Sequence, residues 1–151
     1  MINKIKELAE AIFNDVVAIR RNIHKNPELS FEEYETSSYI KSVLVNWKIP
    51  FTEKIADTGI VVLLKGKNPS VKTLALRADF DALPITELND VEYCSQNKGV
   101  MHACGHDVHT ASLLGVIKIL DVLRNEWEGS VKFIFQPAEE QYPGGAQQMI
   151  K

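Results

Sequence analysis

Residues 102–109, which read HACGHDVH, concentrate side chains that bind metal ions. They include a thiol at Cys104 and an imidazole two positions later at His106. Thiolate and imidazole are preferred ligands of zinc and related divalent metals. An extended or turning backbone points two such residues the same way, and the glycine between them lets the chain bend close to an ion. The competing interpretation is the start of a helix with incidental histidines and one buried cysteine.

Asp107 directly follows this cluster and precedes an apolar helical pattern. A carboxylate at that place can act as the N-cap of the helix. It can equally accept a hydrogen bond from a ligand histidine and so orient it. The sequence leaves both roles open.

Two adjacent carboxylates, Glu139 and Glu140, come soon after an apolar strand predicted at residues 130–136. In open α/β sheets, ligands bind at the C-terminal ends of strands. One carboxylate there can ligate an ion, while the other takes a proton from water and returns it to a leaving amine. In isolation the pair is also typical of a solvated acidic turn. Its presence in the same chain as the Cys/His cluster favours a hydrolytic metal site.

A third polar group follows the strand predicted at residues 73–78. Asp79 or Asp81 could orient a ligand histidine from behind the metal. The alternative is that Arg77 simply pairs with one of these aspartates. We therefore expect polar groups from three strand ends or loops to meet in one crevice.

Other chemistries explain fewer of these residues. The sequence has no G-x-S-x-G nucleophile motif and no glycine-rich phosphate loop. Cys104 could act as a nucleophile with a histidine base, but this leaves the two glutamates without a role. A redox interpretation that uses Cys94 and Cys104 predicts a disulfide between them.

Hydrophobic periodicity predicts the elements that must position these groups. Ser30 and Glu33 form an S-x-x-E capping box, which predicts the start of the second helix. Residues 79–100 are predicted to be a long functional loop. The strand predicted at residues 73–78 is nearly all apolar, which suits a strand that is buried on both faces. Helices are predicted at residues 2–24, 30–47, 108–124 and from 146, and strands at 60–65, 73–78 and 130–136. This order predicts an α/β domain with helices on both faces of the sheet.

Bulk composition narrows the class of protein. A chain of 151 residues with 45% hydrophobic and 25% charged content is typical of one soluble globular domain. Its net charge of -3 argues against a nucleic-acid partner, and no apolar stretch approaches the roughly 20 residues needed to cross a membrane. Residues 1–10 lack the apolar core of a secretory signal, so we expect a cytoplasmic protein. Because the chain stops about one turn into a predicted helix, we expect it to be truncated.

Four ordered motifs resemble the M20 metallopeptidase family. They are residues 21–30 (RNIHKNPELS), 76–84 (LRADFDALP), 101–109 and 135–140. The resemblance extends from about residue 19 to the last residue. It is closest to the amidohydrolase branch, which includes N-acyl-L-amino-acid amidohydrolases, hippurate hydrolases and auxin-conjugate hydrolases.

The resemblance implies a role for each residue of the predicted site. Cys104, His106 and Glu140 would be metal ligands, with Cys104 bridging or anchoring the metal centre. Glu139 would be the general base that activates water, and Asp81 would support the site from behind the ligands. His109 and Asp107 would be further supports.

The resemblance also implies a fold and an activity. Residues 1–151 would be the N-terminal portion of a three-layer α/β/α zinc-peptidase-like catalytic domain. Family members are more than twice this length, and they contribute two further histidine ligands and an inserted dimerisation domain that would lie beyond residue 151. The complete protein would then be a homodimer that hydrolyses the amide bond of N-acyl amino acids or short peptides.

One or two divalent ions would serve as cofactor. Zinc is expected, and manganese, nickel or cobalt also suit these ligand types. The alternative is a non-catalytic fragment that retains the fold with weak or no metal binding.

Overall fold

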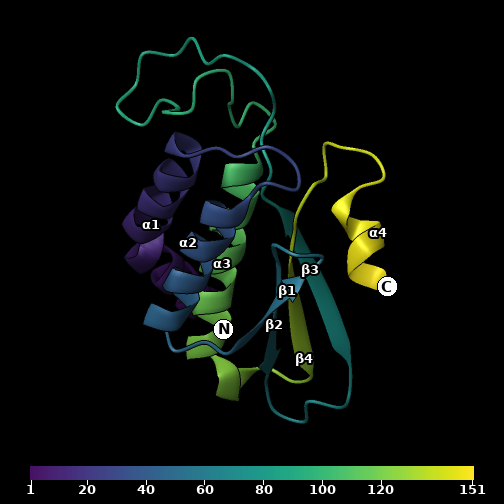
Figure 1. The fold of residues 1–151 in the computed structure, drawn as a ribbon. Helices are drawn as coiled ribbons and strands as arrows, with labels where there is room; N and C mark the ends of the chain where they lie inside the picture. The colour runs from purple at the N-terminus through teal and green to yellow at the C-terminus, as the bar shows by residue number, and fades with distance from the viewer.

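The computed structural model describes residues 1–151 as four α-helices and four strands (Figure 1). The helices are α1 (Ile2–Lys25), α2 (Tyr34–Asn46), α3 (His106–Val122) and α4 (Gly145–Ile150). The strands are β1 (Phe51–Ile55), β2 (Gly59–Lys65), β3 (Thr73–Asp79) and β4 (Ser130–Gln136). A short 3-10 helix, Arg124–Glu126, follows α3. None of the helices combines the length and the apolar character needed to cross a membrane.

The strands form one mixed sheet in the order β1-β2-β4-β3. Strand β2 is antiparallel to both β1 and β4, whereas β3 is parallel to β4. In that parallel pair Asp79 lies opposite Gln136, so the two strands end at the same edge of the sheet. The residues that follow both strands are thereby brought together, as expected for ligand sites in open α/β sheets.

The core lies between the sheet and the helices α1, α2 and α3 (Figure 1). Alternate residues of a strand face the same side, and on β4 this places Phe133 and Phe135 in the core. They pack with buried aliphatic side chains such as Leu114 and Ile117 of α3. Helix α4 lies on the opposite side of the sheet. The predicted α/β fold with helices on both faces is therefore confirmed.

The predicted capping box is wrong. Helix α2 begins at Tyr34, and no side chain caps its first turn. The Ser30 hydroxyl instead donates to Asp81 Oδ2 at 2.7 Å. The Glu33 carboxylate accepts hydrogen bonds from distant residues, including the Ala138 N–H. Both side chains that the local pattern assigned to the helix start therefore form hydrogen bonds with residues distant in the sequence.

Two strands also differ from expectation. Strand β3 is not covered on both faces, because it lies at the edge of the sheet and its residues 73–75 are exposed. Strand β1 has no predicted counterpart. Its register shifts between Thr52 and Ile55, and Lys54 has a positive φ of 61°. This irregularity interrupts the alternation that would reveal a strand.

The long loop predicted at residues 79–100 is confirmed, with β3 extending one residue into it. Between β3 and α3 the chain forms no helix and no extended strand. Isolated bridges pair Leu29 with Ala82 and Leu83 with Met101. The loop therefore leaves the sheet at Asp79 and returns to the same region at the start of α3 (Figure 1).

Candidate metal centre

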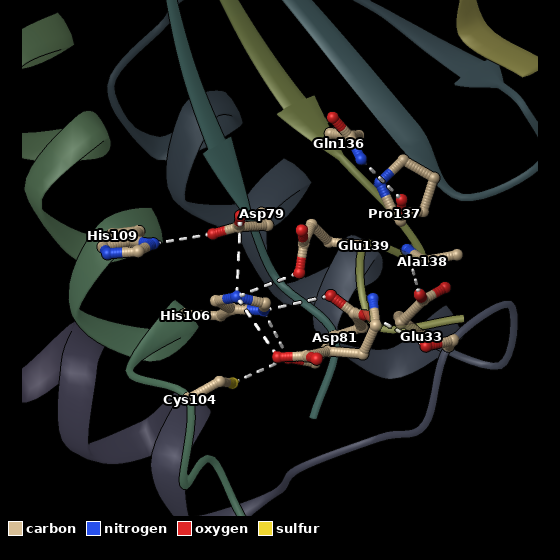
Figure 2. A network of polar contacts seen from close by, with 12 residues as sticks. Glu33, Asp79, Asp81, Cys104, His106, His109, Gln136, Pro137, Ala138 and Glu139 are labelled. Atoms are coloured by element: carbon tan, nitrogen blue, oxygen red, sulfur yellow. Dashed lines mark hydrogen bonds and ion pairs between the residues drawn. The ribbon is translucent and has the colours of Figure 1, made fainter. Parts of the chain in front are cut away.

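Side chains from three segments converge where β3 and β4 end and α3 begins (Figure 2). Asp79 and Asp81 come from the end of β3 and the residues after it, and Glu139 and Glu140 follow β4. Cys104 lies just before α3, and His106 is its first residue. The convergence predicted from the strand ends is therefore present. It follows from the parallel pairing of β3 with β4.

His106 lies at the centre of the cluster with its two ring nitrogens in different environments. Nδ1 donates to Asp81 and lies 3.0 Å from both the Oδ1 atom and the main-chain oxygen of that residue. Nε2 has no hydrogen-bond partner. It lies 3.5 Å from Asp79 Oδ2, 3.7 Å from Glu140 Oε1 and 3.8 Å from Glu139 Oε2. A ring nitrogen surrounded by carboxylates at these separations is an arrangement that suits a shared cation.

Asp81 is completely buried and holds two of the segments together. Its Oδ2 atom accepts the Ser30 hydroxyl at 2.7 Å and the main-chain N–H of Glu140 at 2.9 Å. Burial raises the pKa of this carboxyl, but hydrogen bonds from His106, Glu140 and Ser30 outweigh it and lower the pKa to about 2. Asp81 is therefore ionised and fixes the orientation of two proposed ligand residues.

The charge around His106 favours its protonated form. Burial lowers the pKa of the imidazole, but hydrogen bonds with Asp81 and Cys104 and the charge of Asp79 outweigh it and raise the pKa. A cation at Nε2 would replace that proton and would be stabilised by the same negative charges.

The donor set fits a divalent metal. Ligand atoms of Cys104, His106 and Glu140 lie within 4.8 Å of one another, and so do those of Asp79, His106 and His109. Thiolate, imidazole and carboxylate together are typical of zinc and related metals. The structure thus brings together the three residues predicted as ligands.

The two aspartates after β3 have separate roles. Asp81 accepts a hydrogen bond from the His106 ring, the contact that its proposed supporting role requires. Asp79 is also buried, and it accepts a hydrogen bond of 2.7 Å from His109 Nδ1 and pairs with Arg77 at 2.6 Å. Pairing of Arg77 with an aspartate, which the sequence left as an alternative, is therefore confirmed. Sequence reasoning did not identify Asp79 as a possible ligand, because two aspartates at similar distance from one strand look alike.

Neither role considered for Asp107 is correct. Helix α3 begins at His106, two residues earlier than a cap at position 107 requires, and its N-cap is Gly105, in the left-handed region at φ 88°. Asp107 then lies in the first turn, where it contacts His24 at 2.6 Å and Arg20 at 2.8 Å. It supports the packing of α3 on α1 rather than a ligand histidine.

His102 and Cys94 belong to neither group of candidate ligands. His102 is buried without a hydrogen-bond partner, and burial lowers its pKa to about 4. Cys94 and Cys104 are both free thiols. The disulfide required by the redox interpretation is not formed.

Replacing Asp81 with asparagine is expected to lower metal affinity about 10- to 100-fold, the usual effect of losing a partner that orients a ligand. The amide is neutral, so it no longer supports the basicity of His106. Competition titration with zinc would measure the effect. Asp121→Asn is the control, because Asp121 pairs with Arg124 near the opposite end of α3. An affinity of Asp81→Asn within about threefold of the unmodified protein would contradict the prediction.

Comparisons with known proteins point to one family. The model of the peptidase family M20/M25/M40 matches residues 75–151. The chain is 45% identical over 148 residues to an N-acyl-L-amino acid amidohydrolase of Geobacillus stearothermophilus, covering 98% of this chain and 40% of the relative. It is 45% identical over 153 residues to thermostable carboxypeptidase 2 of Saccharolobus solfataricus, covering all of this chain and 39% of the relative.

A solved structure agrees with these relatives. The Bacillus subtilis YXEP protein, described as a dinuclear metal binding peptidase from the M20 family, superposes with a TM-score of 0.87 at 41% identity. The match covers 93% of this chain and 39% of that protein. The chain thus spans about 40% of the length of the curated relatives described above.

Proposed function

Because the chain belongs to the peptidase family M20/M25/M40, we propose that residues 1–151 form the N-terminal part of the catalytic domain of a metal-dependent amidohydrolase. Its substrates are N-acyl amino acids or short peptides. The convergence of Cys104, His106 and Glu140 beside Glu139 at one edge of the sheet is the strongest support for this proposal.

Cys104, His106 and Glu140 would hold a divalent ion, for which zinc is proposed and manganese, nickel or cobalt are alternatives. When bound, the ion polarises the amide carbonyl and makes water a better nucleophile. Asp81 keeps two of these ligands in place, because it accepts hydrogen bonds from the His106 ring and from the Glu140 main chain. The ligands are therefore oriented before any ion binds.

Glu139 is assigned the role of general base. Its side chain is 42% exposed, and its Oε2 atom lies 3.8 Å from His106 Nε2. It makes no hydrogen bond with another side chain, so its carboxylate is free to meet water and substrate. Glu139 takes a proton from the attacking water and delivers it to the nitrogen of the leaving amine.

The relatives support the substrate class. One is named an N-acyl-L-amino acid amidohydrolase and another a carboxypeptidase. Both names describe cleavage of an amide bond that releases an amino acid. An amide with a free amino-acid carboxylate on the leaving side is therefore the substrate that we propose.

Hydrolysis of N-acetyl and N-benzoyl amino acids by the complete protein tests the proposal. We expect release of the free amino acid, loss of this activity after a chelator removes the metal, and recovery when zinc or manganese is added back. The 151-residue chain should be assayed alongside. Activity that survives thorough chelation, or no cleavage of any N-acyl amino acid or dipeptide, would contradict the proposal and favour a non-catalytic protein that retains the fold.

A further inference from the structure

A buried carboxylate from the N-terminal part of the chain is bonded to the turn that carries the two glutamates. Glu33 is completely buried. Its Oε1 atom accepts the main-chain N–H of Ala138 at 2.8 Å (Figure 2). The same atom accepts the main-chain N–H of Phe31 at 3.0 Å. Its Oε2 atom accepts the Thr58 hydroxyl at 3.0 Å. The bond to Ala138 links residues 105 positions apart.

Ala138 immediately precedes the proposed general base and has an uncommon backbone conformation. Its φ of 48° lies in the left-handed region, which non-glycine residues adopt only when their surroundings hold them there. The Glu33 carboxylate binds its N–H, and the Gly145 N–H donates to its carbonyl oxygen at 2.8 Å. Gly145 itself has no room for a side chain, since a Cβ atom would lie 2.0 Å from the Pro137 oxygen. The turn is therefore closed tightly around Ala138.

The residue on the other side of Glu139 is also fixed. The main-chain N–H of Glu140 donates to Asp81 Oδ2 at 2.9 Å. Glu139 thus lies between two residues whose amides are each bound by a buried carboxylate, Glu33 on one side and Asp81 on the other. Because the Glu139 side chain has no hydrogen bond of its own to another side chain, the backbone on either side sets where its carboxylate lies.

We propose that Glu33 is a positioning residue for catalysis: through the Ala138 N–H it holds the backbone that aims Glu139 at the attacking water. This inference rests on the proposed function, which assigns Glu139 as the general base. A displacement of about 1 Å at a reacting group can cost about 100-fold in rate. The hydrogen bonds of Glu33 go to Phe31, Thr58 and Ala138 and to none of the proposed ligands, so its loss should affect turnover and leave metal binding unchanged.

Three variants of the complete protein separate positioning from stability. Glu33→Met has a similar length but no acceptor for Ala138. Glu33→Gln keeps one carbonyl acceptor, and it is tolerated because burial raises the pKa of Glu33, which makes a neutral side chain acceptable there. Thr58→Val is the matched control, because it removes the donor at Oε2 and leaves the Ala138 bond in place.

With an N-benzoyl amino acid as the probe, Glu33→Met should lower kcat about 10- to 100-fold, with KM and metal content within about threefold of the unmodified protein. Glu33→Gln and Thr58→Val should both keep kcat within about threefold. Equal losses of kcat in Glu33→Met and Thr58→Val would overturn the inference, since Thr58→Val keeps the bond to Ala138. If Glu33→Met does not fold, Glu33→Asp replaces it, because the shorter side chain draws the acceptor away from Ala138. Unchanged kcat in that variant would also overturn the inference.

A double variant distinguishes failure of this inference from failure of the proposed function. If Glu33 acts through Glu139, adding Glu33→Met to Glu139→Gln should cause little further loss of kcat. Independent losses that multiply in the double variant would overturn the inference and leave the proposed function standing. Unchanged kcat in Glu139→Gln alone would instead reject the assigned base, and the inference with it.

Discussion

Replacing Glu139 with glutamine is expected to lower kcat for hydrolysis of N-benzoyl amino acids by about 10²- to 10⁴-fold, the usual contribution of a general base. Glutamine has nearly the same shape but cannot take a proton from water. Glu139 is not a member of either group of candidate ligands. The complete protein should therefore keep its metal, which plasma mass spectrometry can count, and should bind substrate with a similar KM.

Glu128→Gln provides the control for this experiment. Glu128 is an exposed carboxylate whose side chain bonds only to Asn68, so the same substitution there should leave kcat unchanged. A kcat for Glu139→Gln within about tenfold of the unmodified protein would contradict the assignment. Loss of the metal in Glu139→Gln would contradict it in a different way, because Glu139 would then be a ligand.

The parts of this fold that follow hydrophobic patterns are well predicted from the sequence. Strand β4 occupies the residues expected, 130–136, because apolar side chains at alternate positions must face one core. The Glu pair beyond Pro137 then falls at the end of a strand, where a site is expected. The apolar pattern of β3 identifies it as a strand but does not reveal its position in the sheet. Exposure of Leu74, at 56%, follows from the place of β3 at the edge of the sheet.

The contacts that organise the site are less accessible to sequence reasoning. The bond between Glu33 and Ala138 and the bond between His24 and Asp107 span 105 and 83 residues, and neither produces a periodic pattern. Glu33 lies three residues after Ser30, so the local rule assigned it to a helix cap. For Asp107, moving the start of α3 by two residues, from 108 to 106, changes which neighbour the carboxylate faces. Such roles depend on tertiary packing, which local propensity does not encode.

Replacing Cys104 with serine is expected to weaken metal binding by the 151-residue chain by about 100-fold or more, beyond the effect of changing an orienting partner. A thiolate is a stronger ligand for zinc and related metals than a serine hydroxyl, which stays protonated at neutral pH. Metal content per chain after gentle purification would measure the loss. Cys94→Ser is the matched control, because Cys94 is also a free thiol but belongs to neither candidate ligand group.

Stoichiometric metal in the unmodified chain and in Cys94→Ser, together with its loss in Cys104→Ser, would establish that this partial ligand set already holds an ion. Retention of the metal in Cys104→Ser would contradict the assignment of the thiol as a ligand. Absence of metal from all three chains would also contradict the prediction. It would mean that metal binding requires further ligands from the rest of the complete protein. Because Asp81 orients His106 and Glu140 without any help from the metal, we expect the first of these outcomes.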